Sequence, residues 1–136
     1  MKLKNKVLTI NDWYNGPVCG LSMYKGKTYL YMRINEMYNM SNFIIGEYKL
    51  YPIMFVDKLR LLREWKLYCK YIELRKKNLD TTNINKKRKA DLFTILYNTL
   101  CEKYKNTNQT KKFIGVFSGQ YDWGYIPINY KVIWID

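Results

Sequence analysis

Histidine is absent from this 136-residue chain, and acidic residues are scarce. Without histidine, the chain lacks the side chain that proteins use most often as a general base and as a metal ligand. A catalytic triad that depends on histidine is therefore excluded, and no glycine-rich phosphate loop of standard spacing occurs. These absences favour a binding protein that is not an enzyme, and we expect neither a cofactor nor a metal site.

Cysteine is also rare, with three residues at positions 19, 69 and 101. Their number is odd, and their spacing does not match that of paired metal ligands. Cys69 and Cys101 each fall on an apolar helical stripe, where a free thiol behaves as a small hydrophobic group. No apolar run approaches the length of a signal peptide or a membrane span. We therefore expect a cytoplasmic protein with free, buried thiols and no membrane association.

Positive charge is what the chain has in excess. Its 24 Lys and Arg residues outnumber its 11 Asp and Glu residues, which gives a net charge of +13. A charge of this size favours polyanionic partners. Our main interpretation is a small basic protein that binds nucleic acid, a nucleotide or another phosphorylated ligand. The alternative is a protein-interaction module, such as a phage or mobile-element inhibitor of a host system.

The apolar pattern predicts one α+β domain over residues 1–136, a length that suits a single core. Strand patterns cover residues 6–11, 18–24, 28–34 and 43–51, and then residues 112–118 and 130–135 near the end of the chain. Helical periodicity covers residues 53–77 and about 87–105. We expect a mostly antiparallel sheet of five or six strands. Two helices, inserted before the last two strands, would pack on one face of that sheet.

Two groups of cations are candidates for an anion-binding site. The run Lys86-Lys87-Arg88-Lys89 falls at the predicted start of the second helix, where four cations oppose the helix dipole. On the first predicted helix, Arg63, Lys66 and Lys70 share one face. Together these cations would follow a phosphate backbone. The alternative is a solvated charged segment that only keeps the protein soluble.

Two loops of similar composition are the second candidate. Residues 12–17 and 122–127 both contain Asp-Trp, followed by Tyr, Gly and Pro. Trp13 and Tyr14 in the first loop, and Trp123 and Tyr125 in the second, would stack on a nucleobase or anchor a partner. The alternative is that both Trp side chains fold back as lids on the ends of the sheet.

A third candidate concerns Glu47 and Lys49, which share one face of a predicted strand. This Glu-x-Lys triplet resembles part of the motif of the restriction-endonuclease-like nucleases. The resemblance implies a metal-dependent nuclease whose upstream acid is Glu36, or more remotely Asp12. However, such a triplet arises by chance in a chain with 19 Lys residues, and Glu36 falls in a predicted loop. We therefore predict that the pair is not catalytic and forms a surface cross-strand ion pair.

Overall fold

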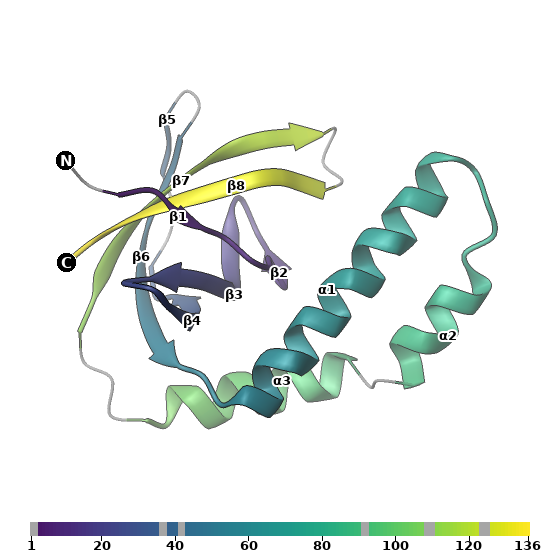
Figure 1. The fold of residues 1–136 in the computed structure, drawn as a ribbon, viewed down its shortest axis with the longest axis horizontal. Helices are drawn as coiled ribbons and strands as arrows, with labels where there is room; N and C mark the ends of the chain where they lie inside the picture. The colour runs from purple at the N-terminus through teal and green to yellow at the C-terminus, as the bar shows by residue number, and fades with distance from the viewer. Residues whose placement is uncertain (1–2, 36–37, 41–42, 91–92, 108–110, 123–125) are drawn as a thin grey trace.

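The computed structural model describes residues 3–35, 38–40, 43–90, 93–107, 111–122 and 126–136. They form an α+β domain of one antiparallel sheet and three helices (Figure 1). The strands are β1 (Asn5–Lys6), β2 (Asp12–Trp13), β3 (Pro17–Tyr24), β4 (Lys27–Arg33), β5 (Tyr38–Met40), β6 (Phe43–Pro52), β7 (Phe113–Asp122) and β8 (Ile126–Ile135). The helices are α1 (Phe55–Lys76), α2 (Thr82–Ala90) and α3 (Phe93–Lys105).

The sheet curls until the N-terminal segment joins its two sides. The strand order is β1-β8-β7-β6-β4-β3-β2, and β5 pairs with β6. Asn5 of β1 is opposite Val132 of β8. Immediately after β1, Val7 bridges to Ser22 of β3, and the Leu8 N–H donates a hydrogen bond to the Leu21 carbonyl at 2.8 Å. Residues 5–8 therefore contact β8 on one side and β3 on the other.

An aromatic core fills the inside of the curled sheet. Its buried members are Ile10, Tyr31, Tyr48, Leu50, Phe113, Phe117, Tyr130, Val132 and Trp134. The polar atoms of this core have partners, because the Tyr31 hydroxyl donates to the Thr9 carbonyl and the Trp134 Nε1 donates to the Ser22 hydroxyl. Gly20 lies beside the first of these bonds, where a Cβ atom would collide with the Thr9 carbonyl. Only glycine therefore lets the N-terminal segment approach β3 this closely.

A second core lies on the outer face of β3 and β4, beneath α1 and α3. Its buried members are Cys19, Leu21, Leu30, Met32, Tyr51, Leu61, Leu100 and Tyr104. Strand β4 is consequently buried on both faces, with Tyr31 in the aromatic core and Met32 in the second core. The sequence of this strand predicts a single apolar face, because Leu30, Met32 and Ile34 alternate with Tyr29, Tyr31 and Arg33. Tyrosine is read as a polar residue in such an alternation. Helices α1 and α3 pack on one face of the sheet, as expected, and α2 packs against these two helices.

The helices differ from the sequence prediction in number. The polar segment between the two predicted helices, residues 78–85, contains the start of α2. There the Asp80 carboxylate accepts hydrogen bonds from the Thr82 N–H at 3.0 Å and from the Thr82 hydroxyl at 2.6 Å. These bonds satisfy backbone and side-chain donors at the helix start. The predicted second helix thus corresponds to α2 and α3. Strand β5 was also missed, because its three residues lie in a stretch rich in Asn and Met that reads as a loop.

Candidate functional site

The helical hairpin formed by α1 and α2 carries most of the positive charge. Residues 55–90 contain twelve Lys and Arg residues and four Asp and Glu residues, so they account for eight of the thirteen net charges. The electrostatic character of this hairpin depends on which of these charged groups face the solvent. Two of the four acids are buried against cations of neighbouring helices.

Glu64 is the first buried acid. Its side chain is 5% exposed, and its Oε1 accepts a hydrogen bond from the Arg88 Nε at 2.8 Å. The Arg88 guanidinium also lies over the rings of Tyr68 and Tyr71, at 5.3 and 5.6 Å from their centroids. Arg88, a predicted anion-binding residue, therefore connects α2 to α1 through a half-buried ion pair.

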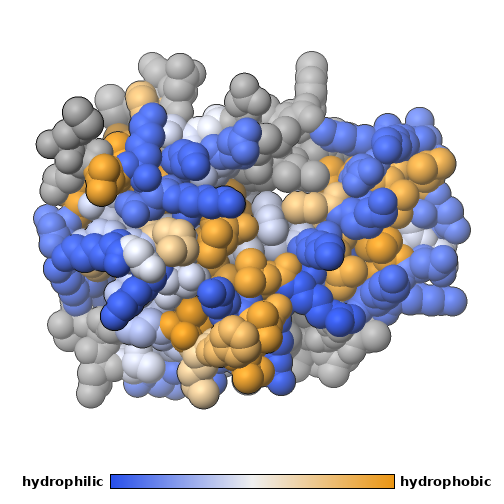
Figure 2. Space-filling model, in the orientation of Figure 1, coloured by the Kyte–Doolittle hydropathy of each residue, from blue (hydrophilic) through white to orange (hydrophobic). Residues whose placement is uncertain are grey.

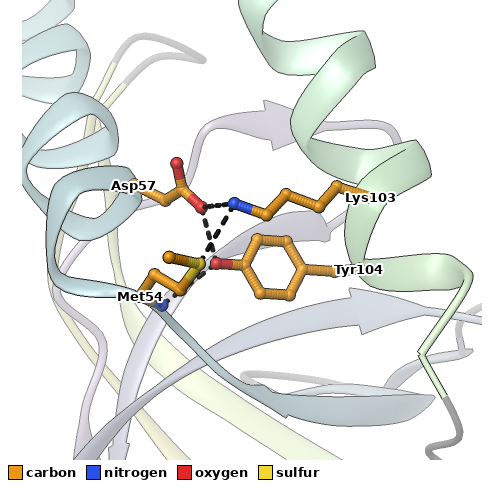
Figure 3. Close-up of polar contacts among 4 residues, drawn as sticks. All are labelled: Met54, Asp57, Lys103 and Tyr104. Atoms are coloured by element: carbon orange, nitrogen blue, oxygen red, sulfur yellow. Dashed lines mark hydrogen bonds and ion pairs between the residues drawn. The ribbon is translucent and has the colours of Figure 1, made fainter.

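Asp57 is the second buried acid, in the first turn of α1 (Figure 3). Its Oδ2 accepts hydrogen bonds from the Lys103 Nζ at 2.8 Å and from the Tyr104 hydroxyl at 2.6 Å, both on α3. Burial by itself would raise the pKa of the Asp57 carboxyl, but these hydrogen bonds and the positive charges of Lys103 and Arg60 outweigh it and lower the pKa. The carboxylate is thus held in its charged form and joins α1 to α3.

Six other cations of the hairpin form an exposed surface. Arg63, Lys66 and Lys70 are spaced by three and four residues, so they follow one line along α1, and all three are exposed. Lys86, Lys87 and Lys89 are exposed on α2. We call these six residues the basic surface. Figure 2 shows hydrophilic side chains interspersed with hydrophobic ones over the region where α1 and α2 lie.

The position of the basic run in α2 corrects one expectation from the sequence. Lys87, Arg88 and Lys89 lie in the last turn of this helix and not at a helix start. The negative end of the helix dipole is at the C-terminus, so these cations are favoured where the sequence analysis placed them in opposition to the dipole. These cations are therefore not held in an unfavourable position at a helix start, and repulsion from the helix dipole is no evidence that they have a function. Their exposure and their neighbours are the relevant evidence.

A shallow hollow of about 140 Å³ lies between α1 and the paired strands β1 and β8. Its lining includes Trp65 of α1 and Tyr130 of β8, together with Lys6 and Lys131. The two lysines are directly opposite each other in the strand register, an arrangement of like charges that is normally unfavourable. This site could not be found from the sequence, because helical periodicity places Trp65 on the same apolar stripe as Cys69, which predicts a buried side chain. The pairing of β1 with β8 brings residues from the two ends of the chain together.

The first aromatic loop separates into a packed and an exposed residue. Trp13 is half-buried against the aromatic core, and its ring lies edge-on to Tyr130 with 6.0 Å between the centroids. Tyr14 is 70% exposed, and its carbonyl accepts a hydrogen bond from the Arg33 Nη1 at 2.7 Å. Trp123 and Tyr125 of the second loop lie outside the described residues.

Glu47 and Lys49 occupy the outer face of β6. The Glu47 Oε1 lies 3.7 Å from the Lys112 Nζ, which makes a cross-strand ion pair with a lysine near β7 rather than with Lys49. No group of three acidic or thiol side chains suited to holding a metal ion occurs among the described residues. Glu36, the residue that the nuclease resemblance implies as upstream acid, lies outside them.

The three cysteines are free thiols. Cys19 is buried in the second core, whereas Cys69 and Cys101 are only partly buried, which is less burial than the sequence suggested. Partial burial still raises the pKa of the Cys69 thiol to about 11, so little thiolate forms at neutral pH. Among the described helices, none is both long and apolar enough to cross a membrane.

Comparisons of the chain with models of protein families, with curated protein sequences and with solved structures found no match. The functional assignment therefore depends on the geometry of the chain itself.

Proposed function

We propose that this protein binds nucleic acid without catalysis, through the phosphate backbone. The observation that carries the proposal is the burial of Asp57 and Glu64 in ion pairs with Lys103 and Arg88. Each acid is neutralised inside the protein, so the solvent side of the hairpin is more positive than its sequence charge alone implies. Such a surface attracts phosphates and releases their counterions on binding.

The line of cations on α1 favours an extended polyanion over a compact phosphorylated ligand. A helix rises 1.5 Å per residue, so the seven residue steps from Arg63 to Lys70 span about 10 Å. Successive phosphates of a polynucleotide are only several Å apart, so a line of this length would meet more than one of them. A small phosphorylated ligand would instead require donors that converge on one point.

The hollow beside α1 favours a single strand over a duplex. The partly buried ring of Trp65 lines this hollow, and Lys6 and Lys131 add positive charge. Trp65 is also adjacent in sequence to Lys66 of the basic surface. Proteins that bind single strands combine a cationic track with aromatic rings on which bases stack. Paired bases in a duplex are not available for such stacking.

Fluorescence anisotropy with a labelled 20-nucleotide single strand tests this proposal. We expect the variant R63Q/K66Q/K70Q to bind at least tenfold more weakly than the unmodified protein. The matched control K4Q/K27Q/K105Q removes three exposed cations outside the hairpin and should change the affinity less than threefold. Equal losses in the two variants would show that only net charge matters, and no binding by the unmodified protein would reject the proposal. A duplex and a nucleoside triphosphate, measured in parallel, distinguish the other ligand classes.

The absence of catalysis is tested separately, by incubating the same strand with the protein and Mg²⁺ or Mn²⁺. We expect the strand to stay intact. Cleavage that is lost in Glu47→Gln, with binding and folding retained, would establish the nuclease alternative in place of this proposal.

A further inference from the structure

A cluster of apolar side chains lies on the outer face of β6, β7 and β8, bordered by the charged residues Glu47, Lys49 and Lys131. In the strand register, Tyr38 of β5 is opposite Ile45 of β6, Ile45 is opposite Val116 of β7, and Val116 is opposite Ile133 of β8. Ile114 and Ile135 form the adjacent row beside Glu47. We call this the outer apolar face; its members are Tyr38, Phe43, Ile45, Ile114, Val116, Ile133 and Ile135.

No described helix covers this face. The second core, which lies beneath α1 and α3, takes its strand residues from β3, β4 and the end of β6. In Figure 1, α1 and α2 lie to the right of the sheet and α3 lies below it, whereas β5 and the adjoining part of β6 lie at the upper left. The members of the outer apolar face belong to neither core. Tyr38 is 72% exposed, Phe43 is 44% exposed and Ile114 is 38% exposed.

An uncovered sheet face of this composition is unusual. Antiparallel sheets that face water on one side normally alternate apolar residues inside with polar residues outside. Here the outer face of β6 carries Phe43 and Ile45 next to Glu47 and Lys49, and the outer face of β7 carries Ile114 and Val116, so apolar side chains occur on both faces of the two strands. A contiguous apolar surface on a soluble domain indicates an interaction site. A hollow of about 410 Å³ beside Tyr38 and Ile114 adds a recess into which a partner side chain would fit.

The charged residues that border the outer apolar face indicate which kind of partner would bind there. Lys111 pairs with Asp136 at 2.9 Å, and Lys112 pairs with Glu47 at 3.7 Å, so both border acids are already matched with lysines. Lys49 and Lys131 add further positive charge along β6 and β8. A second copy of this chain would bring another net charge of +13 to the interface. Electrostatic complementarity therefore favours an acidic partner over self-association.

We propose that the outer apolar face docks an acidic protein, whose apolar surface is bordered by Asp or Glu side chains. This site contains none of the six residues of the basic surface and shares only Lys131 with the hollow beside α1. The complex would bury the Ile and Val side chains against the partner, with the partner's carboxylates near Lys49 and Lys131.

Site-specific photo-crosslinking tests the proposal. p-Benzoylphenylalanine replaces Tyr38 in one form of the protein and Tyr14 in a control form, because the two tyrosines have nearly equal exposure, 72% and 70%. Irradiation is carried out in the cells that naturally make the protein. We expect the form with the crosslinker at position 38, but not the form with it at position 14, to give an adduct with another protein, which mass spectrometry should identify as acidic. With that partner purified, the change I114T/I135T should weaken binding at least tenfold, whereas R63Q/K66Q/K70Q should leave it within threefold.

Several results would overturn the proposal: an adduct with a second copy of the chain, an adduct with nucleic acid, a basic partner, equal adducts from both positions, or no adduct. Threonine keeps the β-branched shape that strands favour, so I114T/I135T is expected to fold. Circular dichroism verifies this. If the double variant is unfolded, the single change Ile114→Thr at the more exposed position is used, with an expected loss of at least threefold.

Discussion

Arg88 on α2 and Glu64 on α1 are joined by a hydrogen-bonded ion pair, with 2.8 Å between Nε and Oε1. The four consecutive cations of residues 86–89 therefore do not act as one group. Arg88 turns inward and fixes α2 against α1, whereas Lys86, Lys87 and Lys89 are exposed. In a variant that lacks all four cations, weaker binding could result from the loss of Arg88 and its ion pair, which destabilises the fold, and not from the loss of a binding residue.

We predict that Arg88→Gln lowers the free energy of unfolding by about 3 kcal/mol, because it leaves a buried carboxylate without its cation. Lys87→Gln should change the free energy by less than about 0.5 kcal/mol, since an exposed lysine on the same helix has little effect on stability. Urea denaturation of the two variants measures the difference. Equal stability of the two variants would contradict the structural role of Arg88.

The pKa of Asp57 predicts a specific loss of stability in acid. Its folded pKa is depressed, so its contribution is fully present above the unfolded value of about 3.9 and is lost as the pH falls through the lower folded value. Urea unfolding at pH 6, 4 and 3 should show a smaller loss of stability in Asp57→Asn than in the unmodified protein. Glu73→Gln is the control, because Glu73 is exposed. An unchanged pH dependence in Asp57→Asn would contradict this account.

Trp13 and Tyr14 should respond in opposite ways to replacement. Trp13→Ala removes a half-buried ring from the aromatic core and should cost about 3 kcal/mol of stability, with little direct effect on binding. Tyr14→Ala should change stability by less than about 0.5 kcal/mol, because the ring is exposed. Thermal melts beside a binding titration measure both effects. A melting temperature of Trp13→Ala equal to that of the unmodified protein would show that the ring is not a lid.

The fold class and most elements could be predicted from the sequence, because apolar periodicity marks elements that bury one face. The predicted strands 18–24 and 28–34 correspond to β3 and β4, and Lys25 and Gly26 between them have positive φ angles, 50° and 76°, which suit a tight hairpin. Periodicity fails where a strand is buried twice. Tyr31 reads as a solvent-facing position of β4, although its ring is fully buried and its hydroxyl is bonded to Thr9.

The candidate site was only partly predictable. Spacing along α1 brought Arg63, Lys66 and Lys70 together correctly, because helical neighbours are fixed by local geometry. The roles of Arg88 and Asp57 depend on which helices pack against α1, and that is tertiary information. Likewise, the pairing of Lys6 with Lys131 joins positions 125 residues apart and follows only from the strand register.

The salt dependence of single-strand binding tests the central claim most directly. Each phosphate contact on a single strand contributes about 0.7 to the slope of log affinity against log salt concentration. We predict that R63Q/K66Q/K70Q and K86Q/K87Q/K89Q each lower this slope by about 2, while K4Q/K27Q/K105Q leaves it unchanged. The same slope in all three variants and in the unmodified protein would contradict the assignment of the basic surface as the nucleic-acid site.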